Sequence, residues 1–258
     1  MSDYTLRDLE LAGVRWELAE SPISTPVTDK KEDIVVSMRP NAATVMAEIG
    51  RVATSIVPPV APTQTMSLDT VRAMASRPND MSTLNRMINE FNHPLRASAT
   101  NTVLPHVGQG SLMILTDIPS SDDDATGQIL SGAVGELMDK MLEAIGLSRA
   151  TVSILPMVFW RTPGGRSPSR AELDMSRPFI DRAIELLRPR VILTLGTLPA
   201  SEMADINLAK SHGMAKVLEN GATIVPIYHP NFLMLKPAAK RDVWNALQNV
   251  QNILKSAE

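Results

Sequence analysis

The sequence contains no cysteine. This absence excludes disulfide bonds, a thiol nucleophile and an iron–sulfur cluster held by cysteine ligands. Aromatic residues are also scarce, at 3% of the chain, so few side chains are available for stacking on a nucleic-acid base. No run of about 18 apolar residues occurs, and the N-terminus lacks a basic region followed by an apolar core. We therefore expect neither a membrane span nor a signal peptide, and a cytoplasmic protein.

Charge and hydrophobicity are ordinary for a folded protein. The 258 residues include 44% hydrophobic and 21% charged side chains, which suit one sizeable domain with an extension. The net charge of −3 argues against nonspecific nucleic-acid binding driven by charge alone, although it leaves room for a local basic patch.

The first quarter of the chain differs in composition from the rest. Residues 5–20 have the apolar spacing of a short helix, whereas residues 21–64 are interrupted by prolines and a charged cluster, with a further helix expected at 42–52. We interpret residues 1–65 as an N-terminal arm and residues 66–258 as the folded domain.

Short apolar runs alternate with amphipathic stretches through the rest of the sequence. Strands are expected at residues 112–115, 151–155, 191–195 and 222–228, and helices at 67–76, 82–91, 132–146, 169–187, 199–204 and 240–255. This order predicts an α/β fold with three layers, α/β/α, around a central four-stranded parallel sheet, preceded by the N-terminal extension.

Candidate catalytic residues follow the expected strands. Asp117 comes after the first strand and His229 after the fourth, and the carboxyl ends of parallel strands share one edge of a sheet. A carboxylate can activate water, and a histidine can donate a hydrogen bond to a leaving group. The alternatives are that Asp117 is a turn residue and that His229 packs in a loop.

Other charged residues allow two interpretations. Basic residues that can meet phosphates, or can be ordinary surface charges, are Arg161, Arg166, Arg170, Lys236, Lys240 and Arg241. The acidic run at residues 122–124 is interpreted as a solvated loop, because no second acidic cluster or histidine pair at ligand spacing supports a metal site. No metal is expected.

Several motifs together resemble those of the uracil-DNA glycosylase superfamily. The family's Gly-Glu-Ala-Pro-Gly, Arg-Pro-Pro-Gly-Asn-Arg and His-Pro-x-Tyr-Leu-Leu-Arg motifs correspond to residues 116–120, 161–166 and 229–235, and its Lys-Arg-x-x-Trp signature is intact at 240–244. Residues from about 91 to 250 are most similar to the family-four type, which normally carries an iron–sulfur cluster. Some bacterial members carry a similar arm.

The resemblance implies a function in DNA. Enzymes of this family flip a base out of the duplex before its glycosidic bond is cut. The resemblance makes Asp117 the residue that positions water and His229 the donor to the departing base, with residues 231–235 as a wedge in the vacated stack. The implied base pocket comprises Ile118, Pro119, Leu130 and Pro156. The implied DNA-binding residues are Arg161, Arg166, Asn231, Phe232, Leu233, Met234, Lys236 and Lys240.

The base pocket departs from the family pattern. Leu130 replaces the stacking phenylalanine and offers no π-face, and Pro156 replaces the asparagine that reads the uracil edge, although proline has neither a side-chain amide nor an N–H. Thr116 and Ser120 replace glycines that let the backbone approach the base.

The expected cluster ligands are also replaced. His93, Trp160 and Ser176 stand at three of the cysteine positions, and we expect neither a cluster nor another cofactor, with Trp160 filling the vacated volume.

Three functions fit these residues. The first is a DNA-repair glycosylase with weak, altered or lost excision of uracil. The second is a non-catalytic module that uses the same fold to bind DNA or a protein. The third is a scaffold that serves a partner repair protein through the arm at residues 21–64. DNA is the expected partner, and the resemblance implies a monomer.

Overall fold

The computed structural model describes residues 66–256. The expected arm, with its helices at residues 5–20 and 42–52, lies outside the described residues. Among the helices in the described part, none is both long and apolar enough to cross a membrane.

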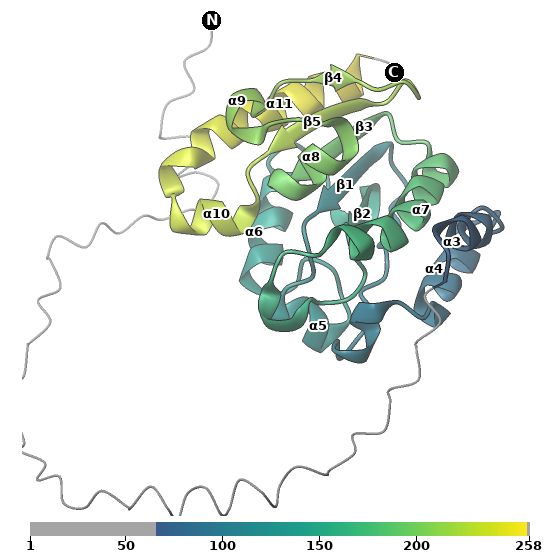
Figure 1. The fold of residues 1–258 in the computed structure, drawn as a ribbon. Helices are drawn as coiled ribbons and strands as arrows, with labels where there is room; N and C mark the ends of the chain where they lie inside the picture. The colour runs from purple at the N-terminus through teal and green to yellow at the C-terminus, as the bar shows by residue number, and fades with distance from the viewer. Residues whose placement is uncertain (1–65, 257–258) are drawn as a thin grey trace, which may run out of the picture. The chain divides into compact units, whose positions relative to one another are not determined.

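A sheet with the strand order β2-β1-β3-β5-β4 forms the middle layer (Figure 1). Its parallel strands are β2 (Val152–Pro156), β1 (Leu112–Thr116), β3 (Val191–Leu195) and β5 (Thr223–Ile227). The predicted α/β fold with four parallel strands is confirmed. The structure adds a short antiparallel edge strand, β4 (Lys216–Val217), which is exposed and too short to give a periodic signal in the sequence.

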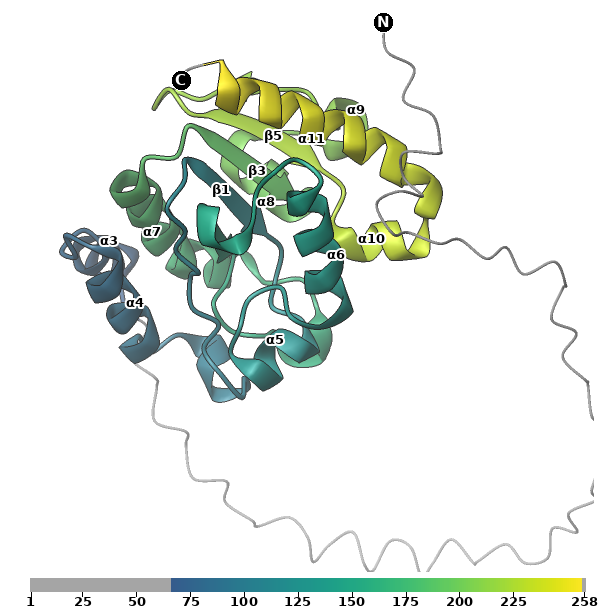
Figure 2. The ribbon, with the colours of Figure 1, turned by 180° about the vertical axis from the view of Figure 1, so that it is seen from behind.

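Helices cover both faces of the sheet (Figures 1 and 2). One face packs against α7 (Arg170–Leu187) and α8 (Thr197–Ala204), and α3 (Leu68–Ala75) and α4 (Met81–Glu90) pack against α7. The opposite face packs against α6 (Gly132–Glu143) and α11 (Lys240–Lys255). The shorter segments are α5 (Ser121–Thr126), α9 (Leu208–Ser211), α10 (Pro230–Leu235), η1 (Pro94–Ala97), η2 (Arg149–Thr151), η3 (Pro163–Gly165) and η4 (Pro237–Ala239).

The central strand β1 shows how the two cores are separated. All five of its residues are buried, which explains why it reads as an apolar run rather than an alternating pattern. Met113 and Leu115 belong to the core under α7, whereas Leu112 and Ile114 belong to the core under α6 and α11. Side chains along a strand alternate between faces, so Thr116 continues the row of Leu112 and Ile114.

The acidic run is a helix rather than the solvated loop that we expected. Ser120 caps α5 in a capping box with Asp123, and both Asp123 and Asp124 are buried. The two carboxylates can be buried because nearby backbone N–H groups donate hydrogen bonds to them. Asp123 accepts from the N–H groups of Ser120 and Ser131 and from the Ser131 hydroxyl, and Asp124 accepts from the N–H groups of Thr100 and Asn101.

These bonds make Asp123 important for stability. We expect Asp123→Ala to lower the free energy of unfolding by about 3 kcal/mol, because buried donors then lose their acceptor. The exposed Asp122→Ala is the matched control and should cost less than about 1 kcal/mol. Urea unfolding of the three proteins measures both values, and equal losses for the two variants would contradict the structural role of Asp123.

Candidate active site

Two candidate catalytic side chains meet beside Gly196, at the carboxyl edge of the sheet. A Cβ atom placed on Gly196 would lie 3.5 Å from the Asp117 Oδ2 atom and 3.6 Å from the His229 Cβ atom. Gly196 has φ = 94°, which disfavours any other residue. The parallel sheet therefore brings the predicted acid and the predicted donor to one place.

The imidazole of His229 is oriented by the start of α10. His229 is the N-cap of this helix, Pro230 occupies its first position, and the His229 Nδ1 atom accepts the Asn231 N–H at 3.2 Å. A ring nitrogen that accepts a hydrogen bond carries no proton, so the neutral ring has its proton on Nε2. That Nε2 atom lies 3.1 Å from the Thr116 Oγ1 atom, and the N–H therefore donates to the threonine hydroxyl.

The environment keeps His229 uncharged. Burial lowers the pKa of His229 from 6.5 to about 4, and the nearby negative charge of Asp123 offsets only part of this effect. A neutral imidazole with a fixed Nε2–H is a suitable donor to an oxygen on which negative charge develops.

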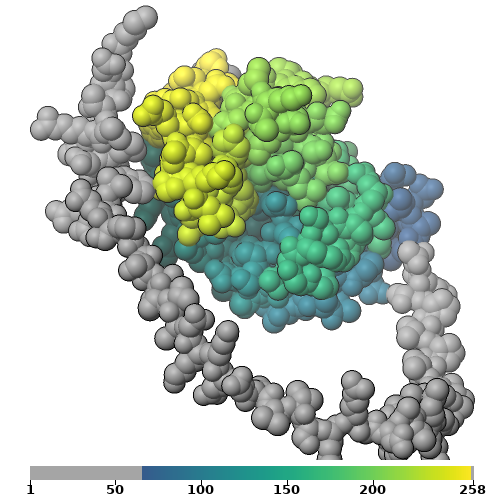
Figure 3. All heavy atoms as spheres, turned by 60° about the vertical axis from the view of Figure 1, so that its left-hand side comes forward, coloured from purple at the N-terminus to yellow at the C-terminus, as the bar shows by residue number. Residues whose placement is uncertain are grey.

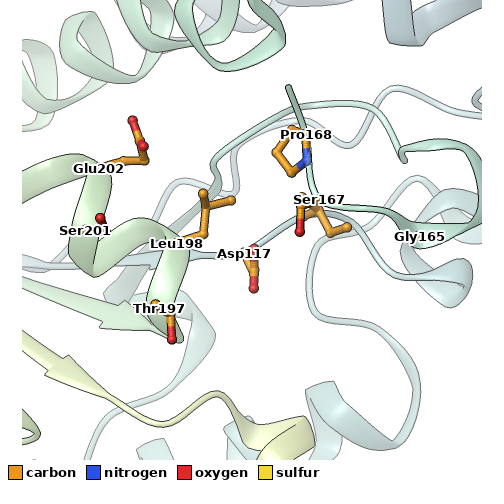
Figure 4. A pocket seen from close by; sticks show the side chains of 9 residues that line it. Asp117, Gly165, Ser167, Pro168, Thr197, Leu198, Ser201 and Glu202 are labelled. Atoms are coloured by element: carbon orange, nitrogen blue, oxygen red, sulfur yellow. The ribbon is translucent and has the colours of Figure 1, made fainter. Parts of the chain in front are cut away.

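Asp117 opens into a pocket of about 420 Å³ on the α7 and α8 side of the sheet. Burial raises the pKa of the Asp117 carboxyl, and a hydrogen bond from the Ile118 backbone partly offsets it. Figure 4 shows Asp117 between the start of α8 and the loop before α7. The lining residues are Asp117, Ile118, Gly165, Ser167, Pro168, Thr197, Leu198, Ser201 and Glu202.

This pocket coincides only in part with the base pocket that we expected. Ile118 lines it, whereas Pro119, Leu130 and Pro156 do not, and all three are buried. Pro156 lies beside Thr116, its partner in the pairing of β1 and β2. Ser201 and Glu202, which also line the pocket, were missed because the sequence of α8 carries no distinctive motif.

The position of Leu130 is fixed through its backbone rather than through its side chain. Its φ of 52° is unusual for a residue with a side chain, and its carbonyl accepts from the Arg149 Nη2 atom at 2.5 Å. A Cβ atom on Gly135 would come within 1.8 Å of the same carbonyl oxygen, so the glycine in α6 is required for this approach. The Leu130 side chain packs in the core under α6.

The predicted basic residues differ in their contacts. Arg166 donates from Nη1 and Nη2 to the Glu172 carboxylate, at 2.9 Å and 2.6 Å. This hydrogen bonding with Arg166 is the main cause that lowers the pKa of Glu172 to about 2. Arg161 has no ion pair within the described part of the chain, and Lys236 lies with its Nζ atom 5.4 Å from the centre of the Phe232 ring.

Helix α10 separates its apolar residues between core and surface. Met234 and Leu235 are 46% and 76% exposed, whereas Leu233 is 1% exposed and packs in the core. Leu233 was among the expected DNA contacts, and the helix turns its side chain inward in this structure. Figure 3 shows the C-terminal segment, in yellow, at the surface of the molecule beside the residues coloured green.

The three replaced cluster positions lie together in the core. The His93 ring stacks on Trp160 with a centroid distance of 4.7 Å, and the Ser176 hydroxyl lies 3.4 Å from His93 Nε2. The same Nε2 atom is 3.0 Å from the Glu172 carbonyl oxygen, and Nδ1 accepts the Leu95 N–H. Both ring nitrogens are therefore engaged, and the two neighbours offer no thiolate, so these residues do not fit an iron–sulfur cluster.

Comparisons with known proteins point to one family. Residues 106–248, which include Asp117 and His229, match the model of the uracil DNA glycosylase superfamily. A type-4 uracil-DNA glycosylase from Archaeoglobus fulgidus is 30% identical over 159 residues, which are 57% of this chain and 79% of that protein. The enzyme of the same name from Thermotoga maritima is 30% identical over 148 residues, or 55% and 76%. That from Saccharolobus solfataricus is 27% identical over 158 residues, or 57% and 73%.

The half-buried His229 should titrate far below an ordinary histidine. We expect its imidazole resonances to shift with a midpoint near pH 4, compared with 6.5 for a free side chain. Because the folded-state pKa is the lower one, the associated stability is complete above about pH 6.5 and is lost as the pH falls through about 4. NMR titration of histidine-labelled protein, with His229→Gln for assignment, measures the midpoint, and a value near 6.5 would contradict the burial argument.

Proposed function

Because this chain belongs to the uracil DNA glycosylase superfamily, we propose that it is a DNA-repair-type protein in which excision of uracil is weak, altered or lost. One observation carries this proposal. The leaving-group donor His229 is kept in an oriented, neutral form, whereas the positions that hold the base are the buried side chains of Leu130 and Pro156.

The retained half of the site supports glycosidic chemistry. The neutral His229 can donate its Nε2–H to a base oxygen that becomes negative as the base leaves. Asp117 also lies beside Gly196, where its ionised carboxylate can orient water and accept a proton from it. The raised pKa makes this carboxylate a stronger base once it is ionised, but it also reduces the ionised fraction at acidic pH.

The changed half of the site argues against tight recognition of uracil. Leu130 cannot supply the stacking energy of an aromatic ring, which is roughly 1–3 kcal/mol per base. Pro156 cannot form a paired hydrogen bond with the uracil edge, and loss of such a contact can reduce discrimination by several powers of ten. We therefore propose a broader or weaker base preference than that of a uracil-specific enzyme.

We place the DNA contact on α10 and its flanking basic residues. The exposed Met234 and Leu235 suit a wedge that enters the space left by a flipped base. Lys236, Arg161 and Lys240 would meet phosphates. Arg166 contributes less to this contact, because its charge is balanced by Glu172.

A non-catalytic DNA-binding or protein-interaction module is the second candidate. It is favoured by the hydrogen bond from His229 to Thr116, which already satisfies the one donor that the reaction needs. The N-terminal arm would then contact a partner repair protein.

An excision assay tests the main proposal. We expect a duplex or single strand that contains uracil to yield abasic sites at least about a hundredfold more slowly than with a type-4 enzyme, since both base-holding residues are changed. Alkaline cleavage of the product measures the rate. His229→Ala should abolish whatever activity remains. Robust excision by the wild-type protein would contradict the proposed loss.

Restoring the base-holding residues tests the physical explanation. We expect the double variant Leu130→Phe/Pro156→Asn to excise uracil at least about tenfold faster than the wild type, which corresponds to about 1.4 kcal/mol in the barrier. Leu130→Met/Pro156→Ala is the matched control, because it supplies neither a ring nor an amide. A folded double variant with no gain would show that the defect lies elsewhere.

The wedge is tested by DNA binding. Met234→Ser/Leu235→Ser should weaken binding to a uracil-containing duplex by about tenfold, through loss of apolar contact. Met214→Ser/Val217→Ser is the control, because these residues are also exposed and apolar but lie near β4. Fluorescence anisotropy at several salt concentrations gives the affinities. Equal effects of the two pairs would contradict the wedge, and affinity independent of salt would contradict the phosphate contacts.

A further inference from the structure

The hydrogen bond between Thr116 and His229 joins two residues that are 113 positions apart in the chain. Thr116 is the last residue of β1 and is 3% exposed. His229 follows β5 and is the N-cap of α10. The contact therefore forms at the carboxyl edge of the sheet, where the candidate catalytic groups lie.

The direction of this hydrogen bond is fixed by the other ring nitrogen. The His229 Nδ1 atom accepts the Asn231 N–H, so Nε2 is the protonated nitrogen and Thr116 Oγ1 is the acceptor. A hydroxyl can also donate, but a base carbonyl oxygen can only accept. The threonine hydroxyl thus occupies the same role towards His229 that an oxygen of a bound base would need.

Both partners are held by their backbones. The Thr116 carbonyl accepts the Met157 N–H at 3.1 Å, and Thr116 pairs with Pro156 across the β1–β2 ladder. The β-branched threonine side chain has restricted rotation about χ1. His229 is fixed by Pro230 and by the Asn231 N–H. The hydroxyl therefore does not leave the imidazole without a cost in free energy.

We propose that Thr116 competes with substrate for the His229 donor: its hydroxyl accepts the hydrogen bond from His229 Nε2–H in the free protein and must be displaced before His229 can donate to a base. This inference rests on the proposed function, because it concerns the same histidine. One N–H cannot serve two acceptors at full strength, so the exchange reduces the gain from binding a base oxygen. A residue without a hydroxyl at position 116 would leave the His229 Nε2–H available to donate to a bound base.

NMR tests the contact without DNA. In protein labelled with ¹⁵N-histidine, the wild type and Thr116→Ser should show a slowly exchanging His229 Nε2–H. Thr116→Val, which keeps the volume but lacks the hydroxyl, should shift this proton upfield and exchange it at least about tenfold faster, as expected for loss of a net hydrogen bond. An unchanged signal in Thr116→Val would overturn the proposal.

Excision rates test the consequence. Thr116→Gly and Thr116→Ala are compared with Thr116→Ser, in the wild type and in the Leu130→Phe/Pro156→Asn background, with thermal melts to show that each variant folds. We expect Thr116→Gly or Thr116→Ala to raise the single-turnover rate of uracil excision at least about tenfold in at least one of the two backgrounds. Thr116→Ser, which keeps the hydroxyl, should not raise this rate. Equal or lower rates in both backgrounds would overturn the masking role. Failure of the proposed function is seen separately, as robust uracil excision by the wild-type protein, while the NMR result still shows whether Thr116 holds the donor.

Discussion

Four parallel strands that are buried on both faces determine where chemistry can occur in this protein. Apart from Ser153 and Thr194, their interiors contain apolar side chains, so the charged candidate groups lie beyond the strand ends. Because the strands are parallel, the ends of β1, β3 and β5 meet at one edge and bring Asp117, Gly196 and His229 together.

Much of the fold could be predicted from the sequence, because in long segments the spacing of apolar residues indicates which side chains are buried. The helix α11 and the strand β3 begin and end at the expected residues. The failures have a common cause, which is that short elements depend on contacts rather than on periodicity. Strand β4 contains only two exposed residues, and α5 depends on backbone donors from residues 100, 101 and 131 that satisfy its buried carboxylates.

The candidate site could be predicted less completely than the fold. The positions of Asp117 and His229 follow from strand order, and the structure places both beside Gly196. The bond from His229 to Thr116 could not be predicted, because it depends on the distance between two strand ends that are far apart in sequence. The inward direction of Leu233 likewise depends on the helical turn of α10, since the sequence alone gives an undivided apolar run.

The changes at the former cluster positions and at the base-holding positions have different physical consequences. His93, Trp160 and Ser176 replace possible ligands with a stacked and hydrogen-bonded set, so the core remains filled and its polar atoms are satisfied. Leu130 and Pro156 also pack well, but neither offers a polar group to a base. The packing of the core at these positions therefore does not depend on contact with a base. The orientation of His229 comes from the start of α10, not from residues 130 and 156.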